Sequence, residues 1–169
     1  MTNDRRLAAS AAVSHGHCHL TVTVSAGAVT DVGFLPLGAA PEPMAGGPPA
    51  GPDEALLRRA QEQLKEYLQG QRQAFDLPLR QPGTLFQDGV WQALRQVPWG
   101  HTSTYAQLAE RIGKPDAARA VGMALNKNRL PILIPCHRIL AADGLGGFSA
   151  GREWKMALLA IEGTTLGLI

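Results

Sequence analysis

Residues 104–122, TYAQLAERIGKPDAARAVG, predict two short helices joined by a tight turn. Thr104 and Gln107 have the spacing of a capping box, which favours a helix that begins directly after Thr104. Gly113 is suited to end that helix, and Pro115 is suited to the first turn of the next one. Two helices connected in this way are typical of the helix-turn-helix motif.

The second predicted helix has an unusually smooth surface, because its small residues leave Arg119 as the only long polar side chain up to Gly122. A smooth helix can approach DNA closely in the minor groove, and the planar guanidinium of Arg119 can replace a base that has left the stack. A helix packed inside the protein, with Arg119 reaching solvent, is the alternative. The helix alone favours that alternative.

The segment Pro135-Cys136-His137-Arg138 carries the best candidate for a nucleophile. A cysteine that follows proline at the start of a turn lies near the positive ends of backbone dipoles, and the next two residues add positive charge. These conditions favour the thiolate, which attacks electrophilic carbon. A buried, unreactive cysteine is the alternative, and the four residues support the two interpretations about equally.

Six short motifs occur in order along the second half of the chain: TYAQLA at 104–109, AARAVG at 117–122, Asn128, PILIPCHR at 131–138, GGFS at 146–149 and Glu162-Gly163. Taken together, these motifs resemble the O6-alkylguanine-DNA alkyltransferases. The resemblance runs from about Thr84 to Gly163 with the order and spacing of the motifs kept, so it is highly specific. The N-terminal half is similar to the family only in its coarse pattern of strands, loop and helix.

The resemblance implies a catalytic role for four residues. Cys136 corresponds to the alkyl-accepting cysteine, and His137 to the histidine that removes its proton through a water molecule. Glu162 corresponds to the acid that orients this histidine, and Asn128 to the amide that braces the active-site turn. The four residues would form a relay of nucleophile, base and orienting group.

The resemblance also implies contacts with substrate and DNA. Tyr105 corresponds to a tyrosine that can give a proton to the departing guanine, and Arg119 to the arginine that fills the gap left in the duplex. Phe148 stands where many relatives have tyrosine, so no hydroxyl is expected there. The expected substrate-binding residues are Tyr105, Pro131, Ile139, Phe148 and Ser149, and the expected DNA-binding residues are Arg119, Thr104, Ala117, Ala118 and Gly122.

The function implied by the resemblance is DNA repair by direct reversal. After nucleotide flipping, Cys136 would take the alkyl group from O6-alkylguanine in duplex DNA, and O4-alkylthymine stays open as a second substrate. The thioether formed is stable, so each molecule is expected to act once. No cofactor is expected, and the expected partner is double-stranded DNA containing O6-alkylguanine, bound by a monomer. Related alkyltransferase-like proteins carry tryptophan in place of the reactive cysteine, and Cys136 argues against that class.

The N-terminal half has the pattern of a small α/β domain. Apolar and polar residues alternate over 20–24, and a second strand is expected over 29–35. The stretch 36–52 is a Pro/Gly-rich loop, after which Asp53 is suited to cap a helix, and a further strand is expected over 75–79.

The predicted fold class is therefore α+β, in two domains. Residues 1–80 are expected to form an N-terminal α/β domain, ribonuclease-H-like by the resemblance. Residues 84–169 are expected to form a mainly helical C-terminal domain that holds the helix-turn-helix, binds DNA and accepts the alkyl group.

Charge and cysteine usage agree with this division. Residues 1–83 carry 7 Lys and Arg against 8 Asp and Glu, whereas residues 84–169 carry 9 against 6, which suits a modest phosphate-binding face. The two cysteines give no disulfide framework, and no segment resembles a signal peptide or a membrane span. We therefore expect a cytoplasmic protein with no membrane partner.

A cluster of possible metal ligands lies near the N-terminus, at His15, His17, Cys18 and His19. Their spacing matches no familiar zinc pattern, and alternating residues of a strand point to opposite faces. No metal site is expected.

Two functions of other classes stay open. A DNA-binding regulator would use the two helices without chemistry and would keep its activity after Cys136→Ala. A cysteine hydrolase would use the Cys136–His137 pair, turn over many times and be indifferent to DNA, and it gives no reason for Arg119 on a smooth helix.

Overall fold

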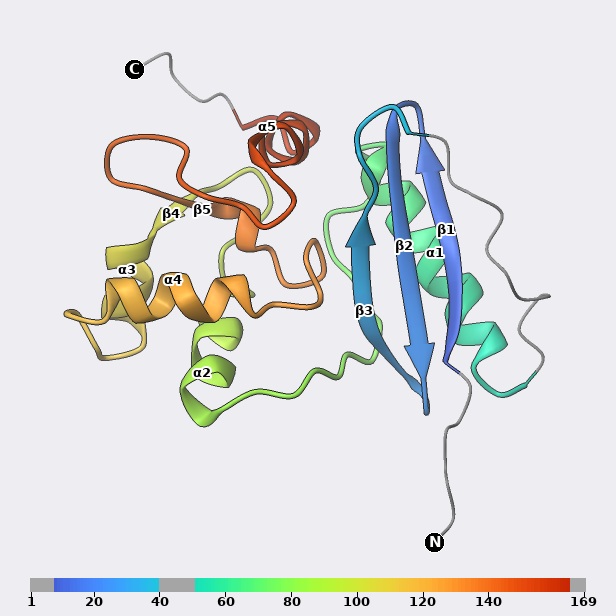
Figure 1. Cartoon of the computed structure of the whole chain (residues 1–169), viewed down its shortest axis with the longest axis horizontal. Coiled ribbons are helices and arrows are strands. Elements are labelled where there is room, and N and C mark those ends of the chain that lie inside the picture. The colour runs from blue at the N-terminus through green and yellow to red at the C-terminus, as the bar shows by residue number, and fades with distance from the viewer. Residues whose placement is uncertain (1–7, 40–50, 165–169) are drawn as a thin grey trace, which may run out of the picture. The chain divides into compact units, whose positions relative to one another are not determined.

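The computed structural model describes residues 8–39 and 51–164, which belong to two compact units (Figure 1). The N-terminal unit ends at Gln81 and the C-terminal unit begins at Pro82. Residues 40–50, which make up most of the predicted 36–52 loop, lie outside the described residues.

The N-terminal unit is a three-stranded antiparallel sheet with one helix against it. The sheet order is β1-β2-β3, and the helix α1 packs against the same sheet (Figure 1). Alternate residues of β2 are fully buried, because successive side chains of a strand point to opposite faces and α1 covers only one of them. The bounds are β1 Ala9–His15, β2 Cys18–Ser25, β3 Ala28–Phe34 and α1 Glu54–Leu68.

Two expectations for this unit need correction, and one strand was missed. The strand β1 was not predicted, because its run of alanines and serines lacks the large β-branched residues that mark a strand. Asp53 does occupy the N-cap position of α1, but its side chain does not cap the helix and instead accepts a hydrogen bond from the backbone N–H of Gly27. The expected strand over 75–79 is only a single bridge between Leu79 and Val29.

The C-terminal unit is mainly helical. Its elements are α2 Leu85–Leu94, β4 Ser103–Thr104, α3 Tyr105–Arg111, α4 Ala118–Asn126, the 3-10 turn η1 Cys136–Arg138, β5 Ile139–Leu140 and α5 Arg152–Ile161. Helices α2, α3 and α4 pack against one another through buried apolar residues. The mixed α/β class predicted from the sequence, with a small antiparallel sheet and separate helices, is confirmed.

Helices α2 and α3 each have a threonine at the N-cap, and each threonine forms a capping box. The predicted box at Thr104 and Gln107 is present before α3, and an equivalent box at Thr84 and Gln87 begins α2. Helix α4 begins at Ala118, three residues later than predicted from Pro115. The reason is that Ala117 closes a turn onto the carbonyl of Lys114, so Pro115 lies in the connection between α3 and α4.

A short parallel pairing brings two functional segments together. Ser103 pairs with Ile139 and Thr104 pairs with Leu140, so β4 and β5 lie side by side. Because β4 runs directly into α3 and β5 directly follows η1, the first turn of α3 lies beside the turn that carries Cys136.

Candidate active site

The backbone before Cys136 is held in place by the side chain of Asn128. This buried amide donates to the carbonyl of Ile134 (2.8 Å) and accepts from the backbone N–H of Leu130 (3.0 Å). The loop it spans contains Ile132 at a φ of 73°, where a β-branched side chain is strained. Asn128 thus stabilises a loop conformation that its sequence alone does not favour.

Cys136 is the first residue of η1, and the residue is 7% exposed. Burial raises its pKa, and this effect is opposed by the Asn128 amide, by the backbone N–H groups of Cys136 and His137, and by the charge of Lys155. The Nδ2 of Asn128 lies 3.4 Å from the Cys136 sulfur. The neighbouring donors and the charge of Lys155 favour the thiolate, but burial outweighs them and the net shift of the thiol pKa is upward.

The positive charge of Arg138, which the sequence suggested as support for the thiolate, is directed elsewhere. Its guanidinium donates to both carboxylate oxygens of Glu162 (2.8 and 3.0 Å) and to the carbonyl of Val97 (2.6 Å). These bonds tie η1 to the end of α5 and to the segment after α2. Arg138 acts on the site through Glu162 and not through the sulfur.

His137 is fully buried and shares Glu162 with Arg138. Its Nε2 lies 2.7 Å from a Glu162 oxygen. Burial lowers the pKa of His137, and the neighbouring Glu162 only partly offsets this effect. Burial alone would raise the pKa of Glu162, but hydrogen bonds from His137 and Arg138 lower it to about 2. Glu162 is thus a carboxylate that only accepts hydrogen bonds, so Nε2 carries the proton and Nδ1 is the basic nitrogen of a neutral imidazole.

Tyr105 lies at the first position of α3, close to Cys136. Burial raises the pKa of Tyr105, as does the negative charge that Cys136 carries when it ionises, while a bond from the Gly147 backbone lowers it. Gly146, at a φ of 72°, lies against the hydroxyl, where an added Cβ would be 3.4 Å from it. An added Cβ at Gly122 would lie 3.6 Å from the Tyr105 ring, so α4 packs closely against this tyrosine.

The remaining predicted residues fall into two groups. Pro131 and Ile139 are buried, Phe148 is half-buried, and Ser149 is exposed on the loop before α5. The predicted DNA-binding residues lie at the start of α3 and along α4, where Arg119 is exposed and Thr104, Ala117, Ala118 and Gly122 are half-buried. The structure thus brings Cys136, His137, Glu162 and Asn128 into one buried cluster and leaves Arg119 at the surface.

A family model described as 6-O-methylguanine DNA methyltransferase, DNA binding domain, matches residues 85–164. The methylated-DNA–protein-cysteine methyltransferase of Methanosarcina acetivorans is 44% identical over 113 residues, which cover 66% of this chain and 72% of that relative. This chain belongs to the methylated-DNA–protein-cysteine methyltransferase family. The family predicted from the motifs is confirmed.

Further relatives support the same membership. The constitutive methylated-DNA–protein-cysteine methyltransferase of Bacillus subtilis is 47% identical over 108 residues, which cover 63% of this chain and 66% of that protein. A crystal structure of Mycobacterium tuberculosis OGT in complex with DNA matches with a TM-score of 0.76 at 34% identity, covering 91% of this chain and 92% of that one.

Within this methyltransferase fold, Lys155 is a residue of the site that the sequence did not single out. Its ammonium is fully buried and donates to the carbonyls of Ile139 (2.6 Å) and Gly147 (3.1 Å). It thereby ties the glycine-rich loop before α5 to β5, and burial lowers its pKa to about 8. A sequence signal existed, because Lys155 lies within the apolar face formed by Trp154, Leu158 and Leu159.

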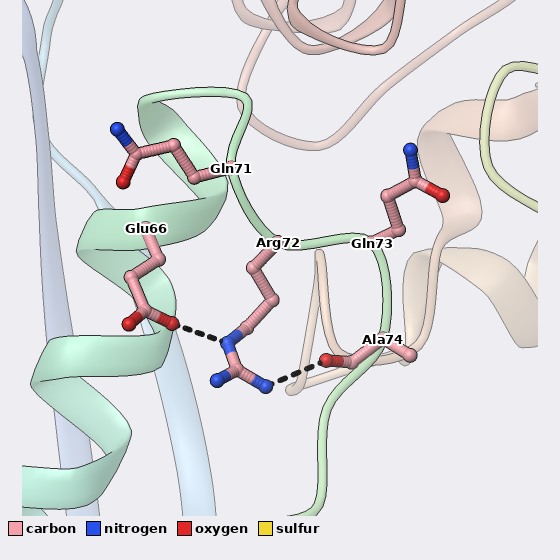
Figure 2. Close-up of a pocket in the computed structure, with 5 residues that line it drawn as sticks. All are labelled: Glu66, Gln71, Arg72, Gln73 and Ala74. Carbon is pink, nitrogen blue, oxygen red and sulfur yellow. Dashed lines mark hydrogen bonds and ion pairs between the residues drawn. The ribbon is translucent and has the colours of Figure 1, made fainter.

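A surface pocket of about 370 Å³ lies in the N-terminal unit, between the end of α1 and the chain that follows (Figure 2). The Arg72 guanidinium crosses it, donating to the Glu66 carboxylate (2.6 Å) and to the carbonyl of Ala74 (3.0 Å) (Figure 2). Its charge is therefore balanced within the protein, and the pocket contains none of the predicted site residues.

The described residues hold neither a cluster of three metal-ligating side chains nor a membrane-spanning helix. Among residues 8–39 and 51–164, no group of three or more His, Cys, Asp or Glu side chains could hold a metal ion, and His19 bonds instead to Ser14. No helix in these ranges is long and apolar enough to cross a membrane.

Proposed function

We propose that this chain repairs duplex DNA by transferring the alkyl group of O6-alkylguanine to Cys136, once per molecule. The observation that carries the proposal is the buried pair of His137 and Glu162, whose Nε2 and carboxylate oxygen lie 2.7 Å apart. His137 directly follows Cys136, so a neutral imidazole stands next to the thiol in the sequence. The relatives described above carry the name methylated-DNA–protein-cysteine methyltransferase, and the Mycobacterium tuberculosis structure is a complex with DNA. Both support the proposal.

The first step is formation of the thiolate. The Cys136 proton passes through a water molecule to the Nδ1 of His137, whose Nε2 stays bonded to Glu162. The imidazolium that forms lies beside a carboxylate, so its charge is balanced. Asn128, with its Nδ2 3.4 Å from the sulfur, and the charge of Lys155 stabilise the thiolate. Because burial raises the thiol pKa, the proton has to be removed within the site.

The second step is displacement at the alkyl carbon. A lone pair of the Cys136 sulfur forms the S–C bond as the C–O6 bond breaks, and the bonding electrons move to the guanine ring. The ring then takes a proton from the Tyr105 hydroxyl, which lies near Cys136, and the tyrosinate regains a proton from water as the His137 imidazolium releases the one it took from Cys136. The product thioether is stable, because a thiolate is a poor leaving group from a simple alkyl carbon, so the protein is consumed. O4-alkylthymine stays an open prediction.

Substrate access requires the nucleotide to leave the duplex, because the O6 position lies inside the base stack. We assign this task to α3 and α4 as a helix-turn-helix, with α4 in the minor groove and Arg119 in place of the extruded base. The backbone of Cys136 and Ile139, together with Ser149, would contact the guanine edge, and Pro131 would wall the pocket beside Phe148. Thr104, Ala117, Ala118 and Gly122 would lie against the DNA backbone.

The remaining assignments follow the family. We propose that residues 84–169 form the DNA-binding and alkyl-accepting domain, and that residues 1–80 form a ribonuclease-H-like domain. The protein would act as a monomer in the cytoplasm and need no cofactor.

Intact-protein mass spectrometry tests the transfer directly. The reduced protein is incubated with a duplex carrying O6-methylguanine, and peptides are mapped afterwards. We expect a gain of one methyl group, confined to the peptide with Cys136 and saturating at one equivalent. Cys18→Ala is the matched control and should gain the methyl group, whereas Cys136→Ala should bind the duplex without gaining it. A wild-type protein that binds the duplex and keeps its mass would leave a DNA-binding regulator instead.

A further inference from the structure

The outer face of α4 carries an exposed methionine in addition to Arg119. Met123 is 66% exposed and lies four residues after Arg119, which places both side chains on the same side of the helix, about 6 Å apart along its axis. Val121, Ala124 and Leu125 form the opposite, buried face. The smooth surface that the sequence indicated up to Gly122 is therefore followed by one large apolar side chain.

The stretch of sequence around Met123 is positively charged. Residues 112–129 contain Lys114, Arg119, Lys127 and Arg129 against a single acidic residue, Asp116. The side chains of these four cations are exposed, as is that of Asn126 on the next turn. An exposed apolar side chain in a stretch rich in exposed cations suits a polyanion with an apolar interior better than it suits a hydrophobic protein partner, because such a partner would have to bury the charges.

We propose that Met123 is a second minor-groove contact, an apolar wedge beside Arg119 that stabilises the opened duplex. The proposal rests on the proposed function and extends it to a residue outside the family motifs. Apolar side chains, methionine among them, unstack base steps when they enter the minor groove. The unbranched thioether of Met123 can adjust to different sequences, since repair must act wherever the lesion lies.

The wedge has a specific energetic role. Arg119 fills the space of the extruded nucleotide, but the neighbouring step remains free to close and to push the nucleotide back into the stack. Met123, one helical turn away, would hold that step open and bury its exposed apolar surface in the process. The contribution should appear only where a stack has to be opened, and it should be absent when the damaged base is already unstacked.

Transfer rates on two forms of the same oligonucleotide test this role. The methyl-transfer rate is measured under single-turnover conditions below saturation, with O6-methylguanine in a duplex and in the single strand. The variants are Met123→Ala and Met123→Leu, and Met156→Ala on α5 is the matched control, since Met156 is also exposed, at 53%. None of these positions belongs to the Cys136 cluster.

We expect Met123→Ala to slow transfer on the duplex about tenfold, equivalent to about 1.4 kcal/mol, and to leave the single-strand rate nearly unchanged. Met123→Leu and Met156→Ala should keep the wild-type rate on both substrates. Wild-type rates for Met123→Ala on the duplex, or equal slowing on both substrates, would overturn the wedge. A wild-type protein that transfers no methyl group to either substrate would instead overturn the proposed function.

Discussion

Replacing Glu162 by glutamine removes one negative charge from the centre of the buried cluster while keeping nearly the same shape. In the wild type, the Glu162 carboxylate accepts from His137 Nε2 and from Nε and Nη2 of Arg138. A glutamine oxygen can replace only part of these bonds, and its amide group would face the Arg138 guanidinium donor to donor. Arg138 would then be a buried cation without its counter-ion.

The pKa of Glu162 and the burial of Arg138 predict a loss of stability of the same magnitude. The drop of the Glu162 pKa from 4.5 to about 2 corresponds to about 3 kcal/mol of stabilisation in the folded state. Removing one partner of a buried ion pair costs about 3–5 kcal/mol, because the other charge stays buried. We therefore expect Glu162→Gln to lower the free energy of unfolding of the C-terminal unit by about 3 kcal/mol at pH 7.

Urea unfolding followed by tryptophan fluorescence measures this loss selectively. All three tryptophans, Trp91, Trp99 and Trp154, belong to the C-terminal unit, so the signal reports that unit. With a slope of about 1.5 kcal/mol per molar urea, the midpoint should fall by about 2 M. Glu153→Gln is the matched control, because Glu153 is exposed on the same helix, and it should change the stability by less than about 0.5 kcal/mol.

The pH dependence supplies a second check. A carboxylate whose folded pKa is lowered stabilises the protein above its unfolded pKa, and this stabilisation is lost as the pH falls through the folded pKa. The gap between wild type and Glu162→Gln should thus be constant from pH 7 to about 5 and narrow between 4.5 and about 2. A gap at pH 7 no larger than that of Glu153→Gln would refute the assignment of Glu162 as the shared counter-ion.

Four further substitutions test other parts of the C-terminal unit. Lys155→Met should reduce the transfer rate at least about tenfold, because the glycine-rich loop loses its tie and the thiolate loses a nearby charge. The pKa of Lys155 is lowered from 10.5 to about 8, so its buried charge destabilises the folded protein fully below pH 8. This destabilisation disappears as the pH rises toward 10.5. Wild-type stability should therefore rise relative to Lys155→Met across that window, and a constant difference in urea unfolding would contradict this. Asn128→Ala should lower the stability by about 2–4 kcal/mol and abolish transfer, measured by urea unfolding and mass spectrometry; a stable, active variant would show that the loop needs no brace. Thr104→Ala should cost about 1 kcal/mol in the same unfolding assay, as should Thr84→Ala, because each removes one capping box, and unchanged midpoints would speak against the caps.

The local elements of the C-terminal unit could be predicted because their signals are local. The capping box at Thr104 acts within four residues, so it can be recognised without any tertiary contact. The delayed start of α4 was missed, because the turn from Lys114 to Ala117 and the start of a helix at Pro115 are both compatible with the same residues. The strand β1 was missed for the opposite reason: its small side chains give no pattern, and only pairing with β2 makes it a strand.

By itself the sequence determined the family and the identity of the motif residues, since Cys136, His137 and Glu162 stand in motifs whose order and spacing are specific. Only the tertiary structure decided which charges act on which atoms. Arg138 is next to His137 in the sequence but bonds to Glu162, and Lys155 lies 19 residues from Cys136 yet contributes to the pKa of its thiol. The physical reason is that burial, hydrogen bonding and charge act over a few ångströms in space, and distance along the chain does not measure that separation.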